Sequence, residues 1–311
     1  MLEGSLWEKV KVEINGTMMG MVIESKDTSN PVLLFVHGGP GMPEYFLTQT
    51  KPTHLDDCFT VVWWDQRGAG LSYDSKIDRE TMTEGQFIDD VNAVAEYLAK
   101  RFGQEKIYLM AHSWGTYLGI QAVEKRPELY EAYLAVGQIT NQPESERRAY
   151  EYMLKYYTEE GNKSMLKKLQ RGDSQSAAYR KIRDAAMHQA GIGTTREMKS
   201  VVTDIFFRSL FFKGYTLSEK VNLWRGKIFS QNSITVTKDI SKTVTELKVP
   251  IYCFSGAYDY TVNYEMAEAY LESLKAPEKE FFLFENSAHS SIFEEPDKVI
   301  KIIKDKVLEN N

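Results

Sequence analysis

One ten-residue stretch, Ile107-Tyr-Leu-Met-Ala-His-Ser-Trp-Gly-Thr116, decides the fold because it places a serine between a strand and a helix. Ile107–Ala111 is a short apolar run typical of a buried strand, and the residues after Gly115 have helical spacing. A sharp turn at Ser113 would present its hydroxyl at the edge of a sheet, as in a nucleophile elbow. Gly115 is the small residue that such a turn requires after the serine, and Ala111 holds the matching position before it. A serine that merely caps a helix is the alternative.

Apolar runs on both sides of this stretch predict an α/β protein with a mostly parallel sheet flanked by helices. An Asn15-Gly16 turn joins two segments that predict a β-ribbon. The predicted strands are Val10–Ile14, Met18–Ile23, Val32–Val36, Thr60–Trp64, Ile107–Ala111, Ala132–Val136, Val249–Phe254 and Glu280–Phe284, and the predicted helices are Phe87–Leu98, Thr116–Val123, Val262–Leu274 and Pro296–Leu308. Strands that alternate with crossover helices favour a sheet covered on both faces.

The alternation of strands and helices stops between residues 139 and 246. This segment is rich in charged and aromatic residues and contains no clear strand, so it is typical of several helices joined by short loops. The alternation returns after it. We therefore predict one α/β core formed by residues 1–138 and 247–311, with residues 139–246 inserted as a helical lid.

The composition argues against nucleic acid and membranes as partners and against secretion of the protein. The formal net charge is −6, whereas binding to nucleic acid needs a basic surface. Cys58 and Cys253 lie in or beside apolar runs and cannot form a disulfide framework. The N-terminus does not resemble a secretory signal, and no segment has the ~20 apolar residues of a membrane span. We predict a cytoplasmic protein with no nucleic-acid or membrane partner.

A glycine-rich loop follows the predicted strand Val32–Val36 and has the sequence His37-Gly-Gly-Pro-Gly41. Acyl transfer creates an oxyanion that preorganised backbone N–H groups must stabilise, and glycine lets the backbone approach closely. In a sheet with a nucleophile elbow, one donor comes from this loop and the other from the residue after the serine. We therefore expect Gly38 or Gly39, together with Trp114, to form an oxyanion hole. The alternative is an ordinary turn.

A serine needs a base to activate its hydroxyl, and the chain has five histidines. His289 lies in a loop just after the last predicted strand, where a doubly wound sheet delivers residues to its crevice. Asp259 follows the preceding strand in the same way. The order Ser113, Asp259, His289 is the order of α/β-hydrolases. His112 is expected to point away from the serine.

At this point the sequence resembles the prolyl iminopeptidase (proline aminopeptidase) branch of the α/β-hydrolases. The resemblance rests on His37–Gly41, Asp65-Gln-Arg-Gly-Ala-Gly-Leu-Ser72, Ser113-Trp-Gly115, Gly256-Ala-Tyr-Asp-Tyr260 and Ala288-His289. It implies the α/β-hydrolase fold and a structural role for the Asp65–Ser72 turn.

The sequence departs from the family pattern at two places, one just before Ser113 and one just before Asp259. Ala111-His112 stands where relatives carry glycine, and Ala257 stands where they often carry arginine. The resemblance also implies that lid glutamates bind the free amine of a peptide. Glu144, Glu146 and Glu151 are the candidates, although glutamates on helices usually form solvated faces.

These observations predict a serine hydrolase that cleaves a small ester or amide through an acyl-enzyme on Ser113. An aminopeptidase of prolyl iminopeptidase type is the best interpretation, and a carboxylesterase or lactonase is the alternative. A non-catalytic receptor with the same fold is a third interpretation. Epoxide hydrolase chemistry is disfavoured because it needs an aspartate where Ser113 stands. We expect no metal or cofactor, and a small-molecule or short-peptide substrate; the sequence leaves the oligomeric state open.

Overall fold

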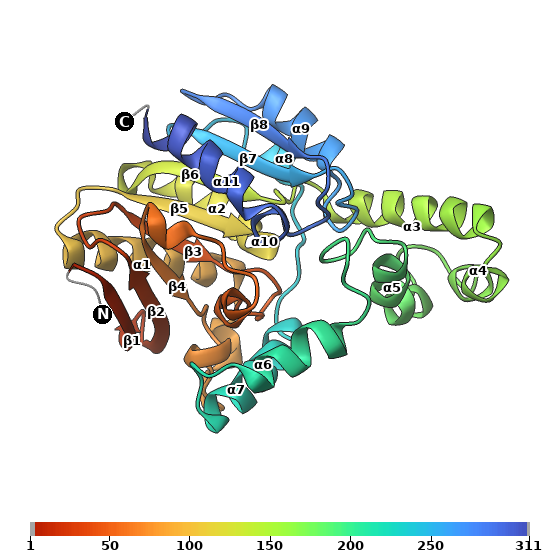
Figure 1. Cartoon of the computed structure of the whole chain (residues 1–311), viewed down its shortest axis with the longest axis horizontal. Helices are drawn as coiled ribbons and strands as arrows, with labels where there is room; N and C mark the ends of the chain where they lie inside the picture. The colour runs from red at the N-terminus through yellow and green to blue at the C-terminus, as the bar shows by residue number, and fades with distance from the viewer. Residues whose placement is uncertain (1–3, 310–311) are drawn as a thin grey trace.

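The structure is a computed structural model in which residues 4–309 are described, and an eight-stranded sheet runs through it (Figure 1). The strand order is β1-β2-β4-β3-β5-β6-β7-β8. The pairs β1/β2 and β2/β4 are antiparallel, and every other neighbouring pair is parallel. The strands are β1 (Leu6–Ile14), β2 (Thr17–Ser25), β3 (Val32–Val36), β4 (Thr60–Trp64), β5 (Ile107–His112), β6 (Tyr130–Val136), β7 (Ile251–Gly256) and β8 (Lys279–Phe284).

The central strands are buried on both faces, as their continuous apolar runs predict. Every residue of β3, β4 and β5 is buried. At the sheet edge, Asn15 and Gly16 have positive φ values of 47° and 71° and join β1 to β2 with Ile14 paired to Thr17. This backbone geometry is that of a two-residue hairpin turn. The predicted ribbon is therefore present, and its strands extend beyond the predicted bounds.

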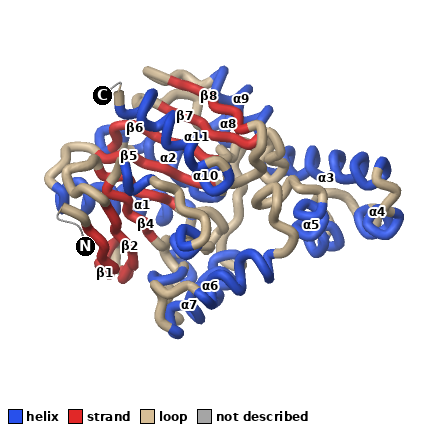
Figure 2. Tube along the Cα trace, viewed as in Figure 1, coloured by secondary structure: helices blue, strands red, loops and turns tan. Residues whose placement is uncertain are grey.

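Helices cover the two faces of the sheet (Figure 2). One buried cluster joins side chains of α1 (Glu84–Phe102), α2 (Trp114–Lys125) and α9 (Tyr264–Ser273) to one face. A second cluster joins α10 (Ser291–Glu294) and α11 (Pro296–Ile302) to the other face. The short helical turns are η1 (Tyr45–Gln49), η2 (Leu55–Asp57), η3 (Gly70–Ser72), η4 (Arg79–Thr81), η5 (Pro127–Leu129), and the π-helical η6 (Val202–Phe206) and η7 (Ile303–Leu308). The α/β class is confirmed.

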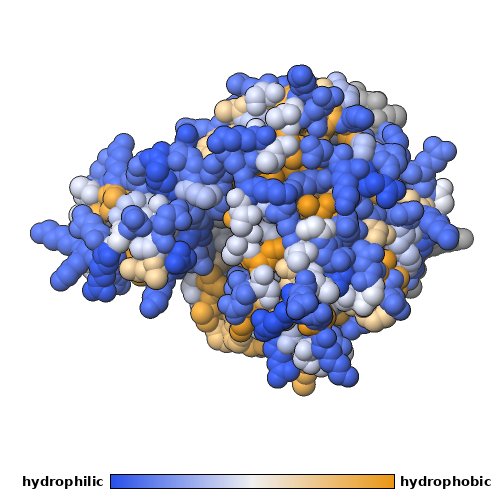
Figure 3. Space-filling view, turned by 180° about the vertical axis from the view of Figure 1, so that it is seen from behind, coloured by the Kyte–Doolittle hydropathy of each residue, from blue (hydrophilic) through white to orange (hydrophobic). Residues whose placement is uncertain are grey.

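Between β6 and β7 the described chain is helical, and we call α3 to α8 the helical insertion. Its helices are α3 (Gln142–Glu159), α4 (Lys163–Leu169), α5 (Ala177–Gln189), α6 (Phe207–Phe211), α7 (Leu217–Gln231) and α8 (Ile240–Thr243). Helices α3, α4 and α5 project to one side of the sheet and share a small core of their own, whereas α6 and α7 lie below (Figure 1). The surface of the projecting arm is largely hydrophilic (Figure 3).

The parallel strands bring distant parts of the sequence to one edge of the sheet. Ser113 follows β5, Gly137 follows β6, Asp259 lies just after β7, and His289 lies in the loop after β8. The carboxyl ends of parallel strands meet at the same edge, which is where open α/β sheets bind ligands. No helix within residues 4–309 is long and apolar enough to cross a membrane.

Candidate active site

Ser113 occupies a strained turn between β5 and α2. Its φ and ψ are 55° and −122°, a conformation that a non-glycine residue rarely adopts. A Cβ on Gly115 would clash with the Val36 carbonyl oxygen, so the turn needs glycine there. On the other side of the turn, a Cβ on Gly119 would lie 3.1 Å from the Ala111 Cβ. Gly119 thus leaves room for the Ala111 side chain.

Asp259 and His289 form a buried hydrogen-bonded pair at the same edge. The distance between Asp259 Oδ2 and His289 Nδ1 is 2.8 Å, and Asp259 is fully buried. The other carboxylate oxygen accepts the Val262 N–H at 2.8 Å. Gly137, with φ of 63°, allows this close approach, since a Cβ there would lie 3.1 Å from His289 Cε1. Gly137 was not among the predicted site residues, although it directly follows a predicted strand.

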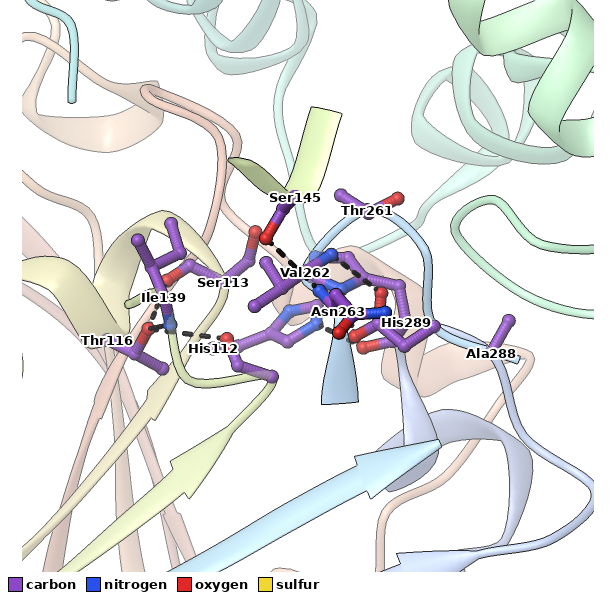
Figure 4. Close-up of polar contacts among 12 residues, drawn as sticks. His112, Ser113, Thr116, Ile139, Ser145, Thr261, Val262, Asn263, Ala288 and His289 are labelled. Carbon is purple, nitrogen blue, oxygen red and sulfur yellow. Dashed lines mark hydrogen bonds and ion pairs between the residues drawn. The ribbon is translucent and has the colours of Figure 1, made fainter. Parts of the chain in front are cut away.

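The remaining ring nitrogen of His289 has no hydrogen-bond partner in the described part of the chain. His289 Nε2 is buried and has no hydrogen bond among residues 4–309. Ser113, His289 and Gly39 line one cavity of about 200 Å³. Figure 4 shows Ser113, His112 and His289 gathered in one cluster. A free imidazole nitrogen beside a serine hydroxyl is the arrangement that a general base requires, and such contacts often tighten only when substrate binds.

The two candidate donors of the glycine loop differ in their partners. The Gly38 N–H donates to Glu44 Oε1 at 2.8 Å. By contrast, neither the Gly39 N–H nor the Trp114 N–H has an acceptor in the described part of the chain. Trp114 is the first residue of the twelve-residue helix α2, whose N-terminal end favours negative charge. Gly39 and Trp114 therefore keep free N–H groups beside Ser113.

His37 holds the glycine loop as a neutral side chain. Its Nδ1–H donates to the Gly38 carbonyl oxygen at 2.7 Å, and its Nε2 accepts the Gln66 N–H at 3.1 Å. Burial lowers the pKa of His37 to about 4. Gln66 also donates to the His37 carbonyl oxygen and accepts the indole N–H of Trp114 at 2.9 Å. The turn that contains Gln66 thus links the glycine loop to the residue after Ser113.

Glu44 and His112 form a second buried pair beside the serine. His112 Nδ1 lies 2.9 Å and 3.0 Å from the two Glu44 carboxylate oxygens, and His112 Nε2 lies 3.1 Å from the His289 carbonyl oxygen. A carbonyl oxygen only accepts, so Nε2 carries a proton. The carboxylate opposite Nδ1 raises the pKa of His112 against the effect of burial, while His112 lowers the pKa of Glu44. We describe the pair as imidazolium and carboxylate.

This pair joins the glycine loop to the loop that carries His289, and sequence reasoning missed it. Glu44 holds Gly38, and His112 holds the backbone of His289. Both side chains line the cavity that contains Ser113, and the rings of His112 and His289 lie 4.9 Å apart. The expectation that His112 points away from the site is therefore wrong. The available signal was a histidine directly before the predicted nucleophile.

The three glutamates predicted to bind an amine lie in different surroundings. Glu146 lines a cavity that also contains Ser113, Gly39 and Trp114. Its side chain is 17% exposed. Arg183 Nε donates to both Glu146 oxygens, at 2.9 Å and 2.8 Å.

The other two glutamates pair with arginines on the outer side of α3. Glu144 contacts Arg147 and Arg148, and Glu151 contacts Arg147. Their side chains are 33% and 58% exposed. Neither lines either of the two cavities described for Ser113. Of the three candidates, the structure brings Glu146 toward the serine.

Among residues 4–309, no group of three or more histidine, cysteine or carboxylate side chains has the geometry of a metal site. The free thiols Cys58 and Cys253 are both buried. Burial raises the pKa of Cys253 to about 12, so this thiol is a poor nucleophile at neutral pH. At this edge of the sheet, the side chains suited to catalysis are therefore those of Ser113, of the pair Asp259 and His289, and of the pair Glu44 and His112.

Comparisons with known proteins place this geometry among related chains. Residues 31–296 match the family model described as alpha/beta hydrolase fold. The chain is 34% identical over 297 residues to the "Probable aminopeptidase YbaC" of Bacillus subtilis (strain 168), with 92% of each chain covered. It is 26% identical to a proline iminopeptidase of Clostridium botulinum, again with 92% of each chain covered.

A solved structure shows the same fold at lower identity. The crystal structure of a proline iminopeptidase-related protein from Thermus thermophilus superposes with a TM-score of 0.58. The two chains are 19% identical, and the match covers 96% of this chain and 98% of the other. The resemblance to the prolyl iminopeptidase branch that the sequence motifs indicated is confirmed by these relatives.

Proposed function

The chain belongs to the alpha/beta hydrolase fold family, and within it we propose that this protein is a serine aminopeptidase, which removes the N-terminal residue of a short peptide or amide through an acyl-enzyme on Ser113. The observation that carries the aminopeptidase assignment is the position of Glu146, a carboxylate of the helical insertion in the wall of a cavity shared with Ser113. The relative that is 34% identical, a probable aminopeptidase, supports it.

The proposed chemistry begins with attack of Ser113 Oγ on the carbonyl carbon. His289 Nε2 accepts the serine proton, and Asp259 holds the imidazole in the tautomer that leaves Nε2 free. The Gly39 and Trp114 N–H groups stabilise the oxyanion. His289 then protonates the departing amine, which leaves the acyl group on Ser113. Water, deprotonated by His289, hydrolyses this ester and restores the serine.

The proposed amine site follows from the charges of the helical insertion. A substrate ammonium in a water-excluded cleft needs a carboxylate partner because an unpaired buried charge is costly. Glu146 and Asp184 flank one guanidinium, Arg183, at 2.6 Å and 2.8 Å. Asp184 lines the cavity of Ser113 as well. Because Arg183 is shared between two carboxylates, its single charge does not neutralise both, and Glu146 can bind a further cation. The insertion then acts as a lid over the site.

The test is a panel of aminoacyl p-nitroanilides, their N-acetylated forms and p-nitrophenyl esters. We expect turnover of the free-amine anilides and loss of turnover on acetylation. Glu146→Gln should reduce kcat/KM for free-amine anilides by roughly 10- to 100-fold, as for the loss of one charge-assisted contact, while changing ester hydrolysis much less. Glu146→Asp, which keeps the charge, should retain part of the preference.

Glu144→Gln is the matched control, since Glu144 lies on the same helix and lines neither cavity that contains Ser113. Equal turnover of acetylated and free-amine substrates would refute the aminopeptidase proposal. Efficient ester hydrolysis in that case would favour the carboxylesterase or lactonase alternative, which the apolar cavity residues Met42, Leu47 and Phe293 also suit. Absence of turnover on every substrate would favour the receptor interpretation. A cytoplasmic location remains a prediction.

A further inference from the structure

Lys227, on α7 of the helical insertion, differs from the other charged side chains of the Ser113 cavity, because no carboxylate of the described chain pairs with it. Glu44 is paired with His112, and Arg183 is paired with Glu146 and Asp184. Lys227 lines the same cavity and forms no ion pair within residues 4–309. Its ammonium group contacts the ring of Trp224, whose centroid lies 5.0 Å away.

Helix α7 is fixed against the glycine loop, so the position of Lys227 relative to the site is defined. A Cβ on Gly41 would lie 2.5 Å from Ser230 Cβ and 3.1 Å from the Gly226 carbonyl oxygen. Lys227 follows Gly226 directly, and Gln231, one helical turn later, lines the cavity too. One face of α7 therefore presents an ammonium group and an amide to the space next to the oxyanion donors.

The electrostatic surroundings of Lys227 favour an anion in the cavity. Burial lowers the pKa of its ammonium group, and the charge of Asp184 offsets this only in part. Asp184 itself is 65% exposed and bound to Arg183. A partly buried cation without a counter-ion is costly. A ligand carboxylate would supply that counter-ion and would be held more strongly there than in water.

We propose that Lys227 binds the C-terminal carboxylate of the substrate, so that the preferred substrates are dipeptides with a free C-terminus. This inference rests on the proposed aminopeptidase function. The substrate amine would lie toward Glu146, and the scissile carbonyl at Ser113. In a dipeptide the leaving residue carries a carboxylate a few ångströms beyond the scissile bond.

The experiment compares three peptides that share the N-terminal residue preferred in the anilide panel. The first is a dipeptide with C-terminal alanine, the second is its C-terminal amide, and the third is an amide with aspartate in place of alanine. We expect kcat/KM for the free dipeptide to exceed that for the alanine amide by roughly 10- to 100-fold. The aspartate amide separates a side-chain carboxylate from the terminal one and should resemble the alanine amide.

Variants of α7 connect this preference to Lys227. Lys227→Met keeps the length of the side chain without its charge and should bring the ratio of acid to amide toward one. Lys227→Arg should restore part of the ratio. Arg225→Gln is the control, because Arg225 is exposed on the same helix and lines none of the cavities that contain Ser113. Its ratio should equal that of the unmodified protein.

Three results would overturn the inference. The unmodified protein could cleave acid and amide within twofold, Lys227→Met could keep the preference, or the aspartate amide could match the free dipeptide. In each case turnover of the aminoacyl anilides would still support the proposed aminopeptidase. If no free-amine anilide is cleaved, the proposed function fails instead, and the peptide carboxylate site fails with it.

Discussion

The α/β core and the helical insertion contribute to the site by different means. In the core, Ser113, Asp259 and His289 lie after the parallel strands β5, β7 and β8, so the order of the strands determines their meeting point. In the insertion, Glu146 of α3 and Lys227 of α7 line two different cavities, each of which also contains Ser113. The positions of these side chains depend on how helices pack rather than on a sheet register. In the proposed mechanism, the core would carry the chemistry and the insertion would select the substrate.

The largest effect should follow a change in the core. Ser113→Ala removes the proposed nucleophile, and we expect kcat to fall by roughly 10⁴-fold or more. The fold should persist, since the change deletes one oxygen atom. Steady-state rates on the best anilide, with circular dichroism as the control for folding, measure this. A variant that keeps more than about a tenth of the rate would contradict covalent catalysis by Ser113.

The second core change concerns the partner of His289. Asp259→Asn keeps the shape of the side chain but can stabilise the wrong imidazole tautomer. We expect kcat to fall by ~10⁴-fold, by analogy with other serine triads. KM should change much less, because Asp259 is buried beneath His289. An unimpaired variant would show that another carboxylate orients the histidine.

A third prediction concerns the pH dependence of core stability. The pKa of His37 is about 4 in the folded protein against about 6.5 for an unperturbed histidine, so the unfolded chain binds a proton more readily. Through His37, the free energy of unfolding should fall as the pH drops from about 6.5 to 4, by roughly 3 kcal/mol. Urea titrations of the unmodified protein and His37→Gln measure this. Equal pH dependence in both would contradict a neutral buried His37.

The smallest effect should follow a change on the outer face of the insertion. Glu151 is 58% exposed and contacts Arg147 on the surface of α3. Glu151→Gln should alter the free energy of unfolding by less than about 0.5 kcal/mol, since exposed ion pairs contribute little. Its kcat/KM should match that of the unmodified protein on free-amine and ester substrates. A marked loss of free-amine turnover would mean that the outer face also binds substrate.

The sequence predicted the core better than the insertion, for physical reasons. The apolar runs Val32–Val36 and Thr60–Trp64 became strands with those bounds, because buried parallel strands leave a strong local signal. The hydrogen bond between Asp259 and His289 agrees with their predicted places after two strands.

Residues that act through side-chain packing were not predictable in the same way. Glu44 follows the glycine loop as an ordinary polar residue, and its contact with His112 spans 68 positions of the chain. Glu144, Glu146 and Glu151 were equivalent candidates until the packing of α5 placed Arg183 against one of them. Lys227 does not belong to any of the sequence motifs that were recognised. Each of these depends on long-range packing that no local pattern encodes.

The most direct test of the account is labelling by a fluorophosphonate probe, followed by mass spectrometry of the intact protein and its peptides. Such probes react with a serine that a base has activated. We predict one adduct per chain, on the peptide that contains Ser113, with no adduct on Ser113→Ala and much slower labelling of Asp259→Asn. Absence of an adduct on an active, folded preparation, or an adduct at another serine, would contradict the assignment of Ser113 as the nucleophile.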